Sequence, residues 1–285
     1  MLGVGGAIGR SQRRGRVSVR ILLTNDDGIH APGLAALRQA VEGLGEATVV
    51  APDTERSGVA HSITLAQPLR IRRVHHGDEL FGYGVNGAPA DCVKLGCDQV
   101  LGRRPDLLLS GINLGPNAAI NILYSGTVAA AIEGAVLGIP SIALSLAEYE
   151  EPDFDQAARV ARRLLERLCC EPLDPGTVLN INIPGLPAAE IKGVRVTHQS
   201  RTGYNDFYEK RVDPWGHAYY WINGELQRDF EQEPDSDLRA LREGYVSITP
   251  LHFDLTHYEA IAGLRERLAG EWGAAPGTSD EREEP

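Results

Sequence analysis

The chain of 285 residues has a single methionine and only four cysteines, and 6% of its residues are aromatic. The cysteines form no CxxC pair and make a poor disulfide framework, so we expect buried free thiols and a cytoplasmic, reducing location. No apolar run approaches the roughly 18 residues of a membrane span, which argues against a membrane protein. The arginines near the start follow a weak apolar segment, the reverse of the order in a signal peptide.

Basic residues are also scarce outside the first part of the chain. The first twenty residues contain five arginines and no acid, so of a formal net charge of −11 the remainder accounts for −16. Nucleic-acid grooves need clustered Lys and Arg to contact phosphates, so a body this acidic argues against a nucleic-acid partner. A small anionic substrate is still compatible, provided that a metal ion or helix N-termini offset the local charge.

Several common catalytic and nucleotide-binding motifs are missing. The sequence contains no P-loop, HExxH motif, EF-hand loop or GxSxG elbow. Two glycine patterns remain: GVGGAIG (3–9) has no strand before it, whereas GYGVNG (82–87) does match GxGxxG. A lone GxGxxG is weak evidence, and this one follows the second predicted strand region, so a nicotinamide-dependent oxidoreductase is kept only as an alternative.

What is present is an alternation of short aliphatic runs and helical patterns. The expected strands are Val19–Leu23, Ala47–Ala51, Asp106–Ser110, Pro140–Leu144 and Val178–Ile183. The expected helices are Gly33–Leu44, Pro89–Leu101, Thr127–Leu137 and Phe154–Leu168. Unbroken aliphatic strands that alternate with helices predict a Rossmann-like, doubly wound α/β fold with a mostly parallel sheet.

The composition divides the chain into four parts. Residues 1–18 form a basic extension, 19–186 the Rossmann-like catalytic domain, 187–268 a β-rich oligomerisation region with a terminal helix, and 269–285 an acidic tail. The later elements are expected at Val194–Thr197, Ala218–Trp221, Tyr245–Thr249 and, as a helix, Thr256–Leu268. Both terminal segments are expected to be disordered.

Two adjacent aspartates, Asp26 and Asp27, stand where the first strand ends, in TNDDG. A lone Asp-Asp pair is usually a helix cap beside a solvated side chain. Ligands of open α/β sheets, however, bind beyond the carboxyl ends of the strands, and here several oxygen-bearing loops converge. Two carboxylates side by side are tolerable if they share a divalent cation, and oxygen ligation selects Mg²⁺, Mn²⁺ or Ca²⁺ over zinc.

Two further oxygen donors and a helix start complete this predicted site. Ser57 and Asn113 follow the second and third strands, although either alone would be an ordinary turn residue. In YSGTV, Ser125 or Thr127 can cap a helix of small residues, and Gly126 allows close approach of the backbone. A helix N-terminus binds anions, so a phosphate beside the metal is the functional interpretation and plain capping the structural one.

One histidine of eight is well placed for catalysis. His61 lies four residues after Ser57. It could protonate a leaving alkoxide near neutral pH, or it could be a structural hydrogen-bonding group, and the sequence does not separate the two.

Seven motifs, taken in order, carry a resemblance to a known family. They are TNDDG, APDxERSG followed by HSIT, NGxPADCVKLG, SGxNxGPN, YSGTVxAAxEG, LNINxP and REGYVSITPL. In this order they resemble the SurE (survival protein E) nucleotidase family, over about residues 19–255. The arginine-rich start and the acidic tail depart from the family pattern.

The resemblance implies a metal-dependent phosphatase that hydrolyses nucleoside 5′-monophosphates, often 3′-monophosphates, and in some members short polyphosphates. It implies one Mg²⁺ or Mn²⁺ per subunit, held by residues that match the family's ligands: Asp26, Asp27, Ser57 and Asn113. The implied phosphate pocket consists of Asn25, Gly58, Ser125, Gly126 and Thr127. The implied assembly is a homodimer, or a tetramer of two dimers, in which C-terminal elements are exchanged between subunits.

Alternatives to this interpretation remain open. An aspartyl-phosphate route is the mechanistic rival, but enzymes of that kind use DxDx[TV], whereas the acids here are adjacent. A non-catalytic nucleotide sensor is the functional rival. The stretch Tyr204–Trp221 carries seven of the seventeen aromatic residues. It reads either as a hairpin folded on its own domain or as an interface, and we expect the interface because an isolated hairpin is marginally stable.

Overall fold

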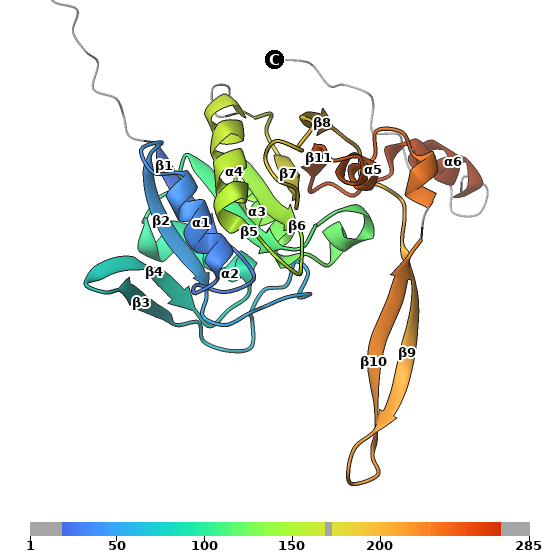
Figure 1. Ribbon diagram of the computed structural model, residues 1–285, viewed down its shortest axis with the longest axis horizontal. Coiled ribbons are helices and arrows are strands. Elements are labelled where there is room, and N and C mark those ends of the chain that lie inside the picture. Colours follow the sequence, from blue (N-terminus) through green and yellow to red (C-terminus); the bar gives the residue numbers. More distant parts are fainter. Residues whose placement is uncertain (1–18, 169–172, 228, 269–285) are drawn as a thin grey trace, which may run out of the picture.

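The computed structural model describes residues 19–168, 173–227 and 229–268 (Figure 1). The predicted extension 1–18 and tail 269–285 lie outside these residues, as do Cys169 and Cys170. The prediction of an α/β fold built on a mostly parallel sheet is confirmed.

A nine-stranded sheet runs through the molecule in the order β3-β4-β2-β1-β5-β6-β7-β11-β8. Its strands are β1 (Arg20–Thr24), β2 (Glu46–Pro52), β3 (Ile71–His76), β4 (Glu79–Val85), β5 (Leu107–Leu114), β6 (Ser141–Ala147), β7 (Thr177–Pro184), β8 (Val194–Val196) and β11 (Val246–His252). Strand β3 runs antiparallel to β4, and β11 runs antiparallel to β7, while the other pairs are parallel.

Helices cover both faces of the sheet because neighbouring side chains of its central strands point to opposite sides. The helices are α1 (Pro32–Ala40), α2 (Pro89–Leu95), α3 (Gly126–Val136), α4 (Phe154–Leu168), α5 (Asp237–Arg242) and α6 (Tyr258–Leu268). Ile21 and Leu23 pack with α1 and α4 on one face, and Leu22 packs with α2 and α3 on the other. Strand β1 is therefore apolar at every internal position, as its sequence predicted.

The predicted helix Pro89–Leu101 is shorter than expected. Helix α2 ends at Leu95 and continues as a π-helical turn, Gly96–Val100. At Gly96 a side chain would come within 3.1 Å of Leu22, so the chain here lies directly on the sheet. Helix α1 also ends early, at Ala40, and the chain turns at Gly43, whose φ is +75°.

Strands β3 and β4 form a hairpin that is absent from the strands expected from the sequence. Two glycines of GYGVNG lie within β4, which pairs in parallel with β2. A side chain at Gly82 would come within 2.5 Å of Val49, and one at Gly87 within 2.7 Å of Asp91. These glycines serve close packing, which removes the basis for a dinucleotide fingerprint.

Strands β8 and β11, from the C-terminal third of the chain, extend the same sheet as the preceding strands. The division of the chain at residues 186 and 187 therefore stays a prediction. Helix α5 packs beside β7 and β11. Within the described residues, no helix is both long and apolar enough to cross a membrane.

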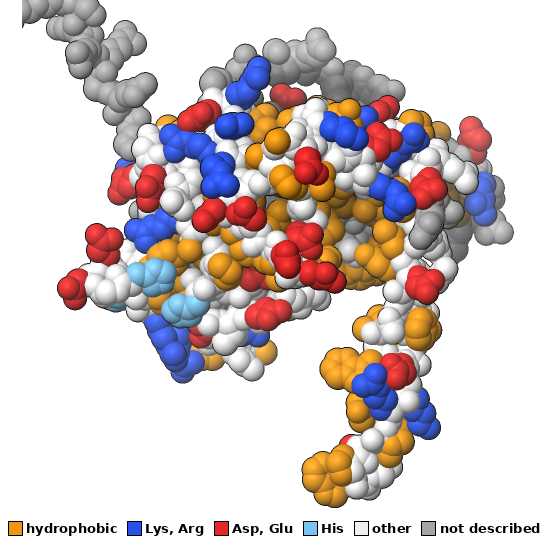
Figure 2. Space-filling model, viewed as in Figure 1, with side chains coloured by type: hydrophobic (Ala, Val, Ile, Leu, Met, Phe, Trp, Pro, Cys, Tyr) orange, Lys and Arg blue, Asp and Glu red, His pale blue; other side chains and the backbone are white. Residues whose placement is uncertain are grey.

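The remaining two strands form a separate hairpin that projects from the body (Figure 1). Strands β9 (Tyr204–Val212) and β10 (Ala218–Leu226) pair over nine residues each. Every residue of β9 is exposed in the single chain, and apolar side chains line the hairpin along its length (Figure 2). Helix α6 likewise contains no buried residue.

Candidate active site at the carboxyl ends of the strands

The predicted site residues lie beyond the carboxyl ends of β1 and β2, near the end of β5, and at the start of α3. Strand β1 ends at Thr24, which pairs with Ser110 of β5, and the two aspartates follow directly. Asn113 lies within β5, after a shift in register between Ser110 and Asn113. A side chain at Gly111 would come within 2.2 Å of the Leu144 carbonyl oxygen, so this irregular stretch requires glycine.

Asp26 is a buried carboxylate aimed at the N-terminus of α3. Its Oδ1 accepts a hydrogen bond from the Thr127 hydroxyl. Burial raises the pKa of Asp26, against hydrogen bonds from that hydroxyl and from the backbone N–H groups of Gly126 and Thr127, which lower it. A side chain at Gly126 would come within 2.8 Å of the Asp26 Cβ, so glycine permits this approach. The N-terminus of α3 thus already holds one carboxyl group.

Asp27 lies at the same edge of the sheet and is partly exposed. Burial raises the pKa of Asp27 to about 6, and the neighbouring charge of Asp26 acts in the same direction. The backbone N–H of Leu114, which donates to Asp27 Oδ2 at 3.4 Å, acts against this. Ionisation of both adjacent carboxyl groups is unfavourable because their charges repel each other, and a bound cation would offset this repulsion.

Two further predicted oxygen donors, Asn113 and Ser57, lie on neighbouring segments of the chain, in β5 and in the loop after β2. The Asn113 side-chain N–H groups donate to the carbonyls of Leu114 and Gly115, so its amide oxygen faces the Thr127 hydroxyl at 3.4 Å. The Ser57 hydroxyl donates to Glu55 at 2.7 Å, and its oxygen keeps lone pairs for another partner. Its neighbour Arg56 donates its backbone N–H to the Asp26 carbonyl at 2.7 Å, which holds Ser57 near the site.

These donors fit a hard divalent cation. The described residues contain no group of three or more His, Cys, Asp and Glu side chains able to hold a metal. A cation here would therefore depend on the carboxylates of Asp26 and Asp27, supplemented by the neutral oxygens of Ser57 and Asn113. An all-oxygen set suits Mg²⁺ or Mn²⁺. The raised pKa of Asp27 shows that no nearby positive charge among the described residues offsets its burial and the charge of Asp26.

The residues predicted to bind phosphate have other contacts in this structure. Ser125 caps α3, because its hydroxyl oxygen accepts from the Val128 backbone N–H at 3.1 Å. The Asn25 amide bridges its own turn, bonding the carbonyl and N–H of Gly28. Gly58 has a φ of +68°, in the left-handed region that favours glycine, within the loop after β2. A phosphate-binding role for these residues stays a prediction.

His61 does not join the aspartates but contacts a buried glutamate. Its Nε2 lies 2.8 Å from Glu133 Oε2, and the other oxygen of that carboxylate pairs with Lys94 Nζ. Burial acts to raise the pKa of Glu133, but the hydrogen bonds from His61 and Lys94 outweigh it and hold that pKa below its ordinary value. A structural role accounts for this geometry, and a catalytic role for His61 stays a prediction.

The sequence interpretation missed Glu133 and Lys94. Glu133 is the one charged residue in α3, among small and apolar neighbours. A charge at such a position is rarely buried unless it is paired, so this isolation was a usable signal. Its partners could not be named, because they lie 72 and 39 residues away in the chain.

Comparison with known proteins decides the family. The model of the family described as survival protein SurE matches residues 21–206, which include every predicted site residue. The chain belongs to the SurE family.

Its SurE relatives match along almost their whole length. A "5′-nucleotidase SurE" of Syntrophobacter fumaroxidans is 46% identical over 255 residues, which is 89% of this chain and 99% of the relative. One from a Synechococcus strain is 48% identical over 259 residues, covering 90% and 98%. The crystal structure of the SurE protein from Aquifex aeolicus has a TM-score of 0.77 and 44% identity, covering 87% of this chain and 99% of that one.

Proposed function

We propose that this chain is a 5′-nucleotidase that hydrolyses nucleoside 5′-monophosphates to nucleoside and phosphate, using one divalent cation per subunit. Relatives named 5′-nucleotidase match 86–90% of the chain, which supports the activity. The observation that carries the mechanism is the adjacent pair Asp26 and Asp27, in which the buried Asp26 is held against the N-terminus of α3.

Different residues of this site would bind the cation, position Asp26 and favour the phosphate. Asp26, Asp27, Ser57 and Asn113 would hold a cation, which when bound supplies the positive charge that polarises phosphoryl oxygens and activates water. Thr127 and Gly126 fix the Asp26 carboxylate through their hydroxyl and backbone N–H groups. The same helix N-terminus favours the negative charge of a phosphate placed beside it. The adjacent acids favour cation binding over an aspartyl-phosphate route.

We expect phosphate release from AMP and GMP to stop in EDTA and to return with Mg²⁺ or Mn²⁺. The reason is that the carboxylates of Asp26 and Asp27 repel a phosphate unless a cation lies between them and it. Colorimetric phosphate assays before and after chelation measure this. A protein that binds AMP in the presence of Mn²⁺ but releases no phosphate would be a nucleotide sensor. Activity that persists after complete removal of metal would refute the proposed dependence on a divalent cation.

We expect Thr127→Val to lower kcat/KM by about 10- to 150-fold, which corresponds to the roughly 1.5–3 kcal/mol of a hydrogen bond to a charged group. Valine keeps the shape of threonine but removes the hydroxyl that holds Asp26. Because the phosphate end is common to all substrates, the loss is expected with AMP, GMP and p-nitrophenyl phosphate alike. An effect confined to one nucleobase would instead place Thr127 in a base pocket.

The proposal extends to related substrates and to the location of the protein. The site residues described above all act at the phosphate end of a substrate, so 3′-monophosphates and short polyphosphates are included in the proposal as further substrates. Cys92 and Cys97 are buried and free, which suits a reducing, cytoplasmic compartment. Neither forms a disulfide, and burial raises the pKa of both thiols, which disfavours the reactive thiolate.

We also propose a homodimer, or a tetramer of two dimers, that covers the β9–β10 hairpin and α6. Both elements expose apolar side chains in the single chain, and neither contributes to the core. Soluble monomers rarely expose apolar surface of this extent, and an isolated hairpin is marginal in water. A second copy of the chain is the partner that is always present, and exchange of C-terminal elements would give both segments a surface to pack on.

A further inference from the structure

The loop that carries Ser57 and Gly58 is long and mostly exposed. It runs from the end of β2 at Pro52 to the start of β3 at Ile71. At one end Arg56 donates its backbone N–H to the Asp26 carbonyl at 2.7 Å. Further along, Thr64 donates its backbone N–H to both oxygens of Asp91, at 3.1 and 3.2 Å. The proposed ligand Ser57 lies between these two ties.

Two contacts fasten the middle of this loop to the region of α3. Ala60 donates its backbone N–H to the Tyr124 carbonyl at 3.1 Å, just before the helix begins. The next residue, His61, places its ring nitrogen 2.8 Å from Glu133. Glu133 lies six residues after Thr127, about 9 Å further along the helix axis. The loop is thus tied both at the start of the helix and two turns along it.

The backbone conformation of Ala60 indicates that these hydrogen bonds constrain the loop. Ala60 has a φ of +52°, in the left-handed region that is unfavourable for an alanine. Such a conformation persists only where the surrounding contacts impose it. The hydrogen bonds of Ala60 and His61 to the α3 region stand on either side of this strained position and are placed to impose it.

The Glu133 carboxylate is buried, and both of its oxygens have a partner. Its side chain is 6% exposed, and each oxygen has a cationic or ring partner, one from the loop and one, Lys94, from α2. Lys94 contacts the carboxylate oxygen that His61 leaves free. Although burial acts to raise the pKa of Glu133, the hydrogen bonds from both partners hold that pKa below its ordinary value, so the carboxylate remains an acceptor for the ring.

From this geometry we infer that Glu133 is a positioning residue: through His61 it fastens the loop over α3 and so holds Ser57 and Gly58 at the distance from Asp26 that the site requires. Lys94 fixes the glutamate, and His61 transmits its position to the loop. In this assignment His61 acts through its contact with Glu133, not as a proton donor to the leaving group. The consequence for catalysis rests on the proposed function, whereas the anchoring of the loop does not.

The test uses amide hydrogen exchange of the full chain, freed of metal by chelation, with Glu133→Gln as the main variant. Glutamine keeps the shape but removes the charge that binds both partners. We expect amide hydrogens of residues 54–63 to exchange about tenfold faster or more than in the wild type, which is the scale of one lost charged hydrogen bond. His61→Asn should have a similar effect, and Lys94→Met a smaller one, because Lys94 does not touch the loop.

A second measurement connects the loop to the site. Equilibrium titration of Mn²⁺ should show weaker binding to Glu133→Gln by about tenfold, because Ser57 is no longer held in place. At low Mn²⁺ the kcat of Glu133→Gln should fall below that of the wild type. At saturating Mn²⁺ most of this difference should disappear, because Asp26 and Asp27 are unchanged. Glu133→Asp, which keeps the charge on a shorter side chain, should restore part of both the exchange protection and the Mn²⁺ affinity.

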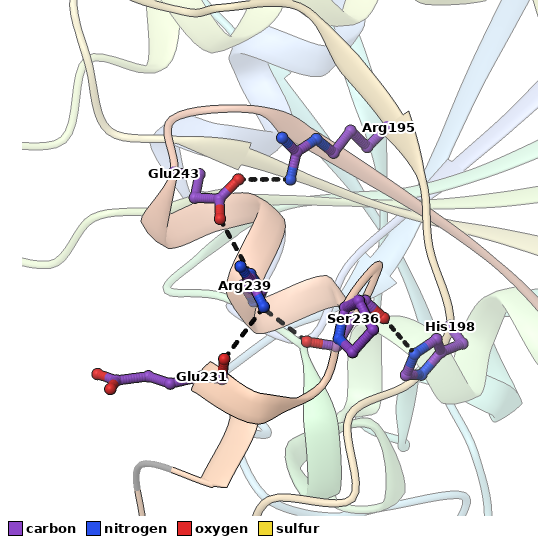
Figure 3. A network of polar contacts seen from close by, with 7 residues as sticks. Arg195, His198, Glu231, Ser236, Arg239 and Glu243 are labelled. Carbon is purple, nitrogen blue, oxygen red and sulfur yellow. Dashed lines mark hydrogen bonds and ion pairs between the residues drawn. The ribbon is translucent and has the colours of Figure 1, made fainter.

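A matched control comes from a second glutamate that holds two cations. Glu243 accepts from Arg239 Nε at 3.0 Å and pairs with Arg195 Nη1 at 2.6 Å, in a network beside α5 (Figure 3). Its side chain is 36% exposed, and the network belongs to the opposite part of the sheet. Glu243→Gln should leave exchange in residues 54–63 and Mn²⁺ affinity at wild-type values.

The outcomes are distinct. If Glu133→Gln remains folded and residues 54–63 exchange as in the wild type, the anchoring role is wrong. If the variant does not fold, His61→Asn decides in the same way, since it removes only the loop's side of the contact. If the wild type releases no phosphate from nucleotides, the proposed function fails, while faster exchange of the loop in the metal-free variant would still establish the anchor.

Discussion

Asp26→Asn is expected to reduce nucleotide hydrolysis by at least about 10³-fold, the largest effect of any single substitution in this chain. Asparagine keeps the size of the side chain but removes half of the negative charge that would hold the cation. Loss of that cation removes several kcal/mol of charge stabilisation, and each 1.36 kcal/mol is a factor of ten in rate. Phosphate release at saturating Mn²⁺ measures the effect.

The interpretation of this result depends on a control for burial. Asp237 is also buried, also has a pKa raised by burial, and also accepts backbone N–H groups, here those of Ala119, Ser200 and Leu238. Asp237→Asn is expected to lower the thermal midpoint but to leave the turnover of the folded protein within a few-fold of wild type. If Asp26→Asn kept near-full turnover with Mn²⁺ bound, the assignment of this site would be wrong.

Much of the fold was predictable because its central strands are buried on both faces. Runs such as Ile21–Leu23 carry no polar position, and only a parallel sheet covered by helices buries such runs. That the loops of the candidate site would meet was also predictable, since the carboxyl ends of parallel strands lie at one edge of the sheet. The contacts of Thr127 with Asp26 and Asn113 bear out that these loops meet.

What the sequence did not reveal depends on contacts between distant residues. The hairpin β3–β4 is an exposed edge whose strands alternate weakly, and its glycines imitate a nucleotide-binding motif. The partners of Glu133 come from a loop and from another helix, and no local pattern couples them. The phosphate-binding role of Thr127 stays a prediction, and no local pattern revealed that its hydroxyl donates to Asp26, which lies 101 residues earlier in the chain.

The exposed hairpin leads to the prediction with the second largest effect. Its cross-strand pairs include Tyr208 with Ile222, and both side chains are exposed, as is Trp215 at the tip, at 80%. Among the residues that the structure describes, no third strand pairs with the two-stranded hairpin and no helix lies against either of its faces (Figure 1). Burying one large apolar side chain stabilises by roughly 1.5–3 kcal/mol, so a partner that covered several would hold the hairpin in place.

We therefore expect Tyr208→Glu combined with Ile222→Glu to convert the assembly into smaller species at micromolar concentration. The two charges occupy one face of the hairpin, where an apolar interface could not cover them without a large desolvation cost. Multi-angle light scattering after size exclusion measures the mass. Leu65→Glu, which places a negative charge on an exposed apolar residue outside the hairpin, should leave the mass unchanged.

Deletion of the chain from Thr256 onward tests the same assembly from its other element. This removes α6, which buries none of its residues in the single chain, and leaves Asp26, Asp27, Ser57 and Asn113 in place. If α6 served only its own subunit, its loss would change little, because no core contact is lost. We expect instead dissociation or unfolding, seen as a lower mass or a lower thermal midpoint, because the helix packs on a partner. A wild-type protein that stays a stable, active monomer at micromolar concentration would refute the proposed assembly.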